Sequence, residues 1–551
     1  MTEPKTRLSI VERFVSMFTK MRPGEGRSVL LFALNAFLIL VCYYILKTIR
    51  EALILVEFDA EVRSYATATQ ALLLMFLVPL YGVLFRSTSK LQLVRWVTVF
   101  FIVNTIIFYI AASAGVQVGF FYFVFVGIYG VMVIAQFWAF AADSFNVKSG
   151  QRLFPVIMIG ASLGALVGGD LTKQLTASGL VSPVGMMLLS ALILATTLVI
   201  NSLGRRSIPE ESRSVYAPES ESKDSKSEHF LGGFAVVMRD RYLVLIAALV
   251  ILLNWVNTTG ETILADFVAR YAEDVVATQG LDKGSVIAAF YGSFYFWVNL
   301  TGFAIQAFLV ARIYRWIGVS GALLILPIVA VLGYGFMAFV PIFSIIRLVK
   351  IFENSVDYSV MNTTRQALFL PTGQAAKYEG KTTIDTFFWR FGDLVQAGAF
   401  YIGLNWLGLS ITQFATLNLV LALVWLGLAV AIGRHYRHLL KTNVLNVAPE
   451  LNKPIPNVQV APGEELLHSL EEDTFIDKDP GDVMTLTAQL ATGGPLPQWL
   501  AFDARQLIFR GRVPDGESGS VEVEVIATDF EGLSASGTFE IHYVRATVGE
   551  G

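Results

Sequence analysis

Residues 43–55 read YYILKTIREALIL and belong to an apolar run that begins near Val29 and is long enough to cross a bilayer. Lys47, Arg50 and Glu51 interrupt this run. One explanation is that the two cations snorkel to the headgroup layer from the end of a membrane helix. The other is that they face a central cavity and hold a charged ligand. The choice between them depends on the organisation of the whole chain.

The composition of the chain indicates that most of it lies in a lipid bilayer. Hydrophobic residues make up 54% of the 551 residues, charged residues make up 15%, and the mean hydropathy is +0.60. Roughly the first four fifths of the chain therefore read as a polytopic membrane protein. A formal net charge of −3 gives no indication of a nucleic-acid partner. Cys42 is the only cysteine, which excludes disulfides and cysteine-based metal sites within one chain.

Apolar segments of membrane-spanning length recur along the chain, and we predict about twelve transmembrane helices. They lie near residues 29–50, 66–85, 95–113, 118–141, 153–171, 183–202, 242–260, 286–311, 317–340, 342–361, 384–404 and 411–433. Lys and Arg collect before the first span and after each even-numbered span, as at Arg205 and Arg206. The positive-inside rule then predicts a multi-pass protein of the cell (inner) membrane with both termini in the cytoplasm.

Composition also divides the chain into domains. A Ser-rich and charged stretch separates two groups of six spans, which is the layout of a major facilitator transporter. No cleavable signal peptide is evident, and residues 8–21 predict an amphipathic helix along the cytoplasmic surface. The predicted domains are a cytoplasmic N-terminus (1–27), a first six-helix half (28–203), a cytoplasmic linker (204–234), a second half (235–441), a linker (442–463) and a small all-β sandwich (464–551). The fold class is thus an all-α polytopic membrane protein with a β-sandwich tail.

A short internal repeat supports the two halves. Residues 47–54 read KTIREALI at the end of the first span, and residues 257–264 read NTTGETIL at the end of the seventh. A two-fold between halves relates these two helices, so Glu51 and Glu261 are expected to face one another, with Asn257 opposite Lys47 and Arg50. The alternatives are an intrahelical Lys47–Glu51 pair or a structural salt bridge between the halves.

Three segments carry a resemblance to a known family. They are YYILKTIREAL in the first span, FWAFAADSFNVKSGQRLFPVIMIGASLGALVGG at 137–169, and DYSVMNTTRQALFLPTGQAAKYEGKTTIDTFFWRFGD at 357–393. In this order they resemble the ATP/ADP translocase family, the nucleotide transporters of plastids and obligate intracellular bacteria. The resemblance implies a major facilitator-like antiporter that exchanges ATP and ADP.

The resemblance also assigns positions. The functionally important first-helix lysine of the family falls at Arg50, and its late cytoplasmic-side lysine falls at Lys381. Two acidic positions of the family fall at uncharged residues, one near Gly127 or Tyr129 and the other at Asn257.

Charged and polar residues of the spans form the predicted site. An unpaired charge inside a span costs roughly 2.5 to 3.5 kcal/mol on insertion scales, so these residues should pair or line a cavity. The predicted substrate-binding residues are Lys47, Arg50, Glu51, Asn257, Glu261, Arg365, Lys381, Asp385 and Arg390. The predicted gating residues are Asp143, Lys148, Arg152 and Asp393. For Arg365 and Lys381, an ordinary orientation signal in a cytoplasmic loop is an equal alternative.

Short alternating runs from about residue 464 predict the β-sandwich of the tail. Segments such as DKDPGDVMTLTAQL and VEVIATDFEGLSASGTFEI resemble cadherin-like, dystroglycan-type immunoglobulin-fold domains. Acidic residues at one end of such domains can bind Ca²⁺, although aspartates that form turns are as good an explanation. The candidate calcium ligands are Asp477, Asp479, Asp482 and Asp529. No other cofactor is expected.

Two classes of function remain. The favoured one is a secondary transporter that moves an anionic metabolite, with ATP/ADP exchange as the case the resemblance implies. The alternative is a non-transporting membrane receptor or scaffold whose tail binds a protein partner. We find no Walker loop, zinc-binding His pair or nucleophile elbow, so an enzyme is not expected.

Overall fold

The chain folds as two compact units in the computed structural model, a helical unit of residues up to 370 and 374–435 and a second unit of 371–373 and 436–551. The structure describes residues 12, 16, 21–87, 90–209, 212, 229–373, 375–443, 448–477, 484–504, 506–515, 518–529 and 532–543. Most of the amphipathic helix predicted at 8–21 and most of the predicted linker lie outside these residues.

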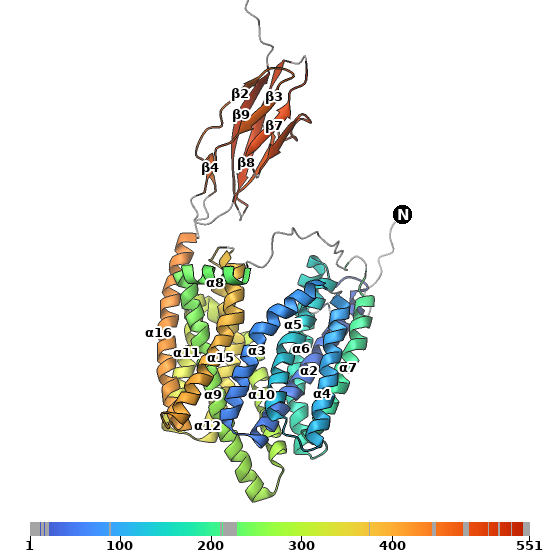
Figure 1. Ribbon diagram of the computed structural model, residues 1–551, viewed down its shortest axis with the longest axis vertical. Helices are drawn as coiled ribbons and strands as arrows, with labels where there is room; N and C mark the ends of the chain where they lie inside the picture. The colour runs from blue at the N-terminus through green and yellow to red at the C-terminus, as the bar shows by residue number, and fades with distance from the viewer. Residues whose placement is uncertain are drawn as a thin grey trace, which may run out of the picture. The chain divides into compact units, whose positions relative to one another are not determined.

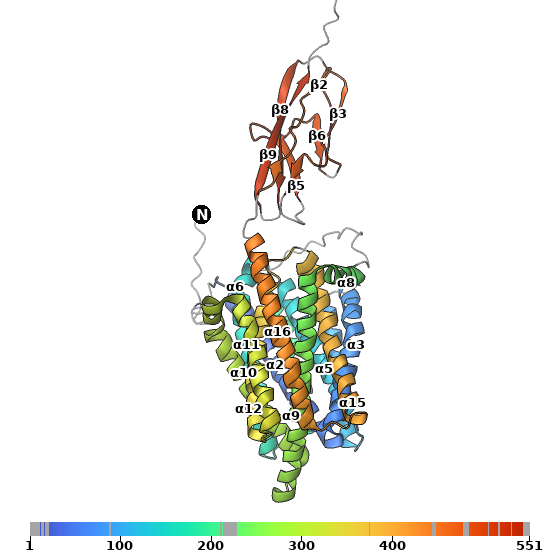
Figure 2. The same ribbon diagram turned by 90° about the vertical axis from the view of Figure 1, so that its left-hand side faces the viewer.

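Long helices build both halves of the helical unit (Figures 1 and 2). The first half contains α2 (Glu25–Glu57), α3 (Ala60–Ser87), α4 (Lys90–Ser113), α5 (Gly119–Ser144), α6 (Val147–Ala177) and α7 (Gly185–Arg206). The second half contains α8 (His229–Arg239), α9 (Arg241–Gln279), α10 (Lys283–Phe308), α11 (Val310–Phe339), α12 (Phe343–Val356), η2 (Asp357–Met361), α13 (Asn362–Ala367), η3 (Ala376–Gly380), α14 (Lys381–Thr383), η4 (Ile384–Phe388), α15 (Trp389–Asn405) and α16 (Ile411–Asn443). The segments η2 and η4 are π-helical turns inside the tenth and eleventh predicted spans, and η3 is a π-helical turn that precedes the eleventh.

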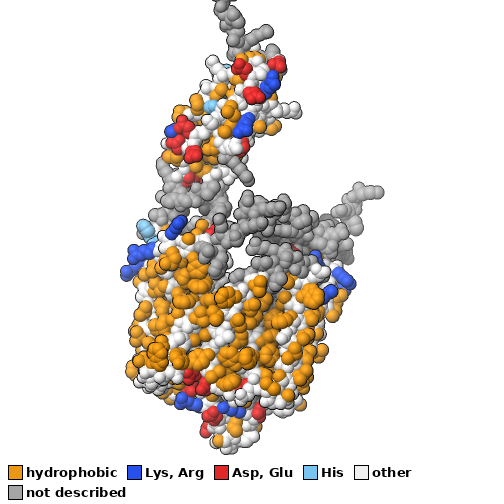
Figure 3. Space-filling model, in the orientation of Figure 1, with side chains coloured by type: hydrophobic (Ala, Val, Ile, Leu, Met, Phe, Trp, Pro, Cys, Tyr) orange, Lys and Arg blue, Asp and Glu red, His pale blue; other side chains and the backbone are white. Residues whose placement is uncertain are grey.

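Helical structure lies at each of the predicted spans. In the described part of the chain, 9 helices are long and apolar enough to cross a membrane by length and composition. The tenth and eleventh predicted spans are outside that set because π-helical turns divide them into shorter helices, so that α12 has 14 residues and α15 has 17. On the face shown in Figure 3, hydrophobic side chains form a broad band with charged side chains gathered at its edges.

Side-chain caps fix the starts of several helices. Asn146 accepts a hydrogen bond from the backbone N–H of Ser149 at 2.9 Å and begins α6. Asp240 and Asp282 begin α9 and α10 in the same way. These side chains satisfy backbone donors that have no partner within the helix. At 39 residues, α9 is about 58 Å long and, with the start of α10, projects beyond its neighbours (Figures 1 and 2).

Glycines spaced by four residues pack α6 against α2. A Cβ added at Gly160, Gly164 or Gly168 would lie 2.3, 2.2 or 2.7 Å from a backbone carbonyl oxygen of α2. Only residues without a side chain allow the two helices to come this close. The stripe therefore serves helix packing.

The second unit contains a β-sandwich whose two main sheets enclose an apolar core that includes Phe509 and Phe539. Its strands are β1 (Glu450–Leu451), β2 (Val458–Val460), β3 (Glu465–Ser469), β4 (Phe475–Ile476), β5 (Thr485–Leu490), β6 (Leu500–Asp503), β7 (Ile508–Arg512), β8 (Gly519–Thr528) and β9 (Ser534–Tyr543). The sheets have the orders β2-β9-β8-β5 and β3-β7-β6, and β1 pairs with β4. The sandwich begins earlier than the predicted residue 464, because β1 and β2 lie in the predicted linker (442–463) and β2 pairs with β9.

Candidate functional site

An ion-pair chain links the two halves near the turn between α2 and α3. Glu51 of α2 accepts a hydrogen bond from Arg63 Nε of α3 at 2.6 Å, and Arg50 Nη2 lies 3.2 Å from the same carboxylate. Arg63 Nη2 also lies 3.8 Å from Glu261 Oε2 on α9. Arg63 thus stands between the glutamates of the internal repeat, one from each half.

The series of ion pairs continues into the second half through residues of α12. Lys350 Nζ lies 3.7 Å from Glu261 Oε1 and 2.9 Å from Glu353 Oε2, and it donates to Asn257 Oδ1 at 2.9 Å. The Tyr334 hydroxyl of α11 donates to Glu353 at 3.0 Å. We call Arg50, Glu51, Arg63, Glu261, Lys350 and Glu353 the charged network. Its three cations balance its three carboxylates.

Burial makes this pairing necessary. Glu51 and Lys350 are 0% exposed, and Arg63 and Glu353 are nearly so. Taking one partner away from such a pair leaves an uncompensated buried charge, which costs about 3 to 5 kcal/mol. The charged network therefore holds the halves together at the end of the unit that contains the α2–α3 turn. Hydrogen bonds from Ser64 to Gln396 and from Asn405 to Glu61, both 2.8 Å, join the halves at the same end.

Lys47 has a different environment. Its side chain is 9% exposed, and its Nζ lies 4.1 Å from the centre of the Tyr295 ring and 5.5 Å from that of Tyr44. Among the described residues, no carboxylate oxygen lies within 4.0 Å of Lys47 Nζ, so Lys47 forms no ion pair with them. Aromatic faces attract a cation but do not neutralise it. Lys47 is thus a buried cation beside a charge-balanced network.

The structure tests the predicted alternative in which Lys47 and Glu51 form an ion pair within one helix. Glu51 pairs with Arg63 and Arg50, so the predicted alternative of an intrahelical Lys47–Glu51 ion pair is wrong. The guanidinium of Arg63, one turn into the next helix, outcompetes the ammonium because its planar donors bond the carboxylate in a fork.

The other predicted binding residues lie apart from the charged network. Arg365 Nε lies 3.7 Å from Asp385 Oδ1, and its guanidinium covers the Trp389 ring at 4.2 Å. These contacts stay within the second half. Lys381 is the first residue of α14, and Arg390 lies in the first turn of α15. The prediction that these residues bind substrate stays a prediction.

Two of the four predicted gating residues, Arg152 and Asp393, have partners within their own halves. Arg152 donates to Glu25 at 2.8 Å, which ties α6 to the start of α2. Asp393 Oδ1 accepts a hydrogen bond from Thr258 at 2.8 Å. Asp143 lies at the end of α5, and the Lys148 side chain lies outside the described residues. Their gating role stays a prediction.

The predicted calcium ligands are only partly described. Asp479 and Asp482 lie outside the described residues, whereas Asp477 follows β4. Asp529 Oδ1 accepts a hydrogen bond from the Leu533 backbone N–H at 2.8 Å, which is a turn-forming role. The described residues include no group of three or more His, Cys, Asp or Glu that could hold a metal ion.

Sequence reasoning missed Arg63, Lys350, Glu353 and Tyr334. Arg63 stands just before the predicted second span, where a charged residue ordinarily belongs to the membrane interface. Lys350 and Glu353 were signalled by their position inside the tenth predicted span, at the i, i+3 spacing that pairs charges on a helix. Their partners on α9 and α11 are distant in sequence, so they can be identified only from the three-dimensional structure.

The two acidic positions that the resemblance implies are occupied by neutral groups. A Cβ placed on Gly127 would lie 1.8 Å from Gln70 Oε1, so the Gln70 side chain of α3 fills the space beside Gly127. Asn257 accepts a hydrogen bond from Lys350. In both places an amide, and not a carboxylate, faces the interior.

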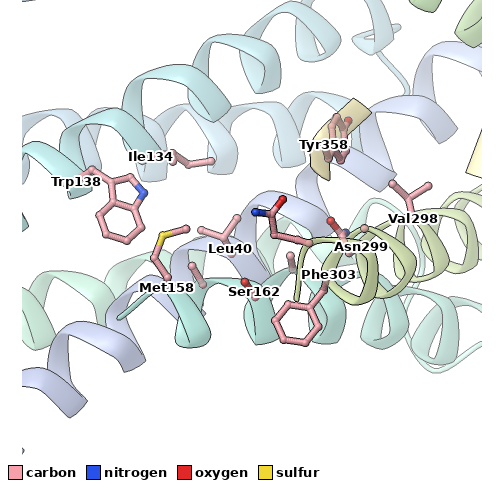
Figure 4. Close-up of a pocket in the computed structure, with 13 residues that line it drawn as sticks. Leu40, Ile134, Trp138, Met158, Ser162, Val298, Asn299, Phe303 and Tyr358 are labelled. Atoms are coloured by element: carbon pink, nitrogen blue, oxygen red, sulfur yellow. The ribbon is translucent and has the colours of Figure 1, made fainter. Parts of the chain in front are cut away.

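A cavity of about 290 Å³ lies between the halves, away from the charged network (Figure 4). Its walls come from α2, α5 and α6 of the first half and from α10 and η2 of the second. Leu40 lies near its middle, while Trp138 and Tyr358 stand on opposite sides (Figure 4). Its lining is mainly apolar and contains no charged residue.

Two helical halves that enclose a cavity and a charged network, followed by a β-sandwich, define a multi-pass membrane protein of the major facilitator-like fold with an immunoglobulin-like domain. Comparison of the sequence with models of protein families agrees with this architecture. The TLC ATP/ADP transporter model matches residues 118–436, and the He_PIG model of an Ig domain matches residues 448–544. The chain belongs to the TLC ATP/ADP transporter family. This confirms the resemblance, and it places the chain among transporters and not among enzymes.

Curated relatives share this family resemblance at low identity. ADP,ATP carrier protein 1 of Chlamydia trachomatis is 24% identical over 344 residues, which cover 55% of this chain and 62% of the relative. ADP,ATP carrier protein 1 of Chlamydia muridarum is 25% identical over 308 residues, which cover 49% of this chain and 56% of the relative. The chain thus spans about three fifths of the length of these relatives.

Solved structures show the same fold. A point mutant of the nucleoside transporter NupG superposes with a TM-score of 0.55 at 12% identity, over 75% of this chain and 99% of that chain. A POT family transporter in complex with 5-aminolevulinic acid gives a TM-score of 0.52 at 13% identity, over 75% and 96% of the two chains. At these identities the likeness concerns the fold alone.

Proposed function

We propose that this chain is a secondary transporter that exchanges nucleotides such as ATP and ADP by alternating access between its two halves. The observation that carries the proposal is the buried Lys47, a cation with no carboxylate partner among the described residues, next to a network whose charges balance. A polyanion that entered between the halves would supply the missing negative charge. The ADP,ATP carriers among its relatives support nucleotides as the anion.

The charged network supports alternating access. Within the halves, Arg63 lies 2.6 Å from Glu51 and Lys350 lies 2.9 Å from Glu353, whereas the contact that crosses between the halves, Arg63 to Glu261, is 3.8 Å long. Separation of the halves at this contact would leave Arg63 on Glu51 and leave Glu261 on Lys350. Each half therefore keeps partners for its buried charges when it rocks against the other.

The distribution of Lys and Arg supports an inner-membrane location with both termini in the cytoplasm. On that topology the immunoglobulin-like tail belongs to the cytoplasm, where a protein partner is a more suitable ligand than Ca²⁺. We propose that the tail binds a protein partner there.

Exchange in proteoliposomes tests the role of Lys47. At 4 Å and an effective dielectric constant of about 20, one unit charge pair contributes up to about 4 kcal/mol. We expect Lys47→Met to slow uptake of labelled ATP into ADP-loaded vesicles by at least tenfold, which is about 1.4 kcal/mol. Lys47→Arg should retain most of the rate.

The matched control is Lys283→Met, since Lys283 forms a surface pair with Glu273. It should leave uptake unchanged. Equal rates for Lys47→Met and Lys283→Met would contradict a role for Lys47 in anion binding.

A further inference from the structure

The cavity between the halves has the chemistry of a neutral ring and not of a phosphate. Trp138, Phe303 and Tyr358 present aromatic surface, and the carboxamides of Asn299 and Gln306 lie in an otherwise apolar wall. Ligand pockets typically combine an apolar lining with a few placed polar groups, in volumes of roughly 300 to 1,000 Å³. A cavity of about 290 Å³ without a charged residue suits part of a nucleotide, because the phosphates need cations.

The carboxamides retain hydrogen-bonding capacity toward the cavity. Asn299 Oδ1 accepts from the Tyr44 hydroxyl at 2.9 Å and its Nδ2 donates to the Tyr295 carbonyl at 2.8 Å, which leaves one N–H and one lone pair. Gln306 Oε1 accepts from Thr363 at 3.2 Å, and its Nε2 bonds no described residue. A carboxamide can bond the N6 and N7 edge of adenine in a bidentate manner.

A hydrogen bond and two aromatic rings link the cavity wall to the buried cation. Asn299 in the cavity wall is bonded to Tyr44, and the rings of Tyr44 and Tyr295 also face Lys47 Nζ at 5.5 and 4.1 Å. Tyr295 and Asn299 are one turn apart on α10. A neutral, ring-binding space and a cation therefore adjoin each other across a shared aromatic wall.

We propose that this cavity is the subsite for the heterocyclic base of the transported nucleotide, where Trp138 and Tyr358 provide ring faces and the carboxamides of Asn299 and Gln306 read the edge of the base. The phosphates point toward Lys47. This inference rests on the proposed function and deepens it, because it assigns the residues that distinguish a nucleotide from a simple polyphosphate.

Competition in proteoliposomes of the full-length protein separates the two subsites. Uptake of labelled ATP into ADP-loaded vesicles is measured against unlabelled ATP and against tripolyphosphate, which has phosphates but no base. For the unmodified protein, we expect ATP to compete on the order of tenfold better, since one base stacked on an aromatic ring contributes that much or more.

The variants Gln306→Leu, Asn299→Leu and Tyr358→Ala should each weaken competition by ATP at least fivefold and leave tripolyphosphate unchanged. Gln306 is exposed, so its variant tests the base subsite without loss of a buried contact. The matched control is Asn104→Leu, because Asn104 bonds the Phe100 carbonyl of its own helix α4. It should alter neither competitor.

Three outcomes would overturn the inference. Variants that weaken both competitors equally would show that the cavity affects the whole site and not the base. Variants that weaken neither would place the base elsewhere, while ATP/ADP exchange itself would stand. Absence of exchange by the unmodified protein would reject the proposed function, and the base subsite with it.

Discussion

Replacing Glu261 by glutamine removes the charge that joins the second half to the first without changing the size of the side chain. The Glu261 carboxylate lies 3.8 Å from Arg63 Nη2, 3.7 Å from Lys350 Nζ and 2.7 Å from the Asn354 amide that bonds it. Glutamine can still accept from Asn354. Lys350 keeps Glu353 and Arg63 keeps Glu51, so each half retains its own ion pair.

The magnitude follows from the contact between Arg63 and Glu261. At 3.8 Å and an effective dielectric constant of about 20, the Coulomb attraction is about 4 kcal/mol. Glu261 is 16% exposed and both groups regain water when the halves part, so the net contribution is smaller, about 1 to 2 kcal/mol. Glu261→Gln should therefore shift the equilibrium toward the state that is open at this end by roughly 5- to 30-fold.

Spin-label distances measure this shift. Val116 and Leu407 lie in connections of opposite halves at the α2–α3 end, and they are 55% and 66% exposed. Cysteines at these positions can carry the labels, since Cys42 is fully buried. Double electron–electron resonance should show a longer-distance population that grows in Glu261→Gln.

The control is Glu273→Gln on the same helix, where the carboxylate is 64% exposed and pairs with Lys283. It should leave the distances unchanged. Identical distance distributions for Glu261→Gln and the unmodified protein would refute the view that this contact holds the halves together.

Two further predictions concern packing and the tail. Gly164→Val should abolish recovery of folded protein in detergent, because its Cβ would lie 2.2 Å from the Phe37 carbonyl oxygen, whereas Gly427→Val has open space and should fold; equal yields would contradict this role. In the tail, burial lowers the pKa of His468 from its ordinary 6.5, and its Nε2 has no hydrogen-bond partner among described residues. The folded sandwich disfavours the protonated ring, so its free energy of unfolding should fall as pH drops below about 6.5. Denaturant unfolding of residues 448–544 from pH 7.5 to 5.5 should show this loss, and His468→Phe should remove it; the same pH dependence in both would contradict the assignment.

The sequence predicts the spans well because their signal is local. A run of about 20 apolar residues indicates a membrane helix without reference to the rest of the fold. The repeat between Lys47 and Asn257 also placed Glu51 and Glu261 at the interface of the halves. Arg63 escaped prediction because a charge next to a span is ordinarily an interfacial residue.

Partners that come from distant helices could not be predicted. Lys350 is fully buried because α9 supplies Asn257 and Glu261, and no local pattern indicates this combination. The start of the β-sandwich was misplaced for a related reason. The pairing of β2 with β9 joins residues about 80 positions apart, and the prolines around β2 resemble those of a linker.

Counter-exchange by the unmodified protein tests the central claim most directly. The purified full-length chain is reconstituted into liposomes that contain either ADP or no nucleotide, and uptake of labelled ATP is followed in both. The account predicts rapid uptake that requires internal ADP. No uptake in either preparation would contradict nucleotide exchange and would favour the alternative of a non-transporting membrane receptor with a partner-binding tail.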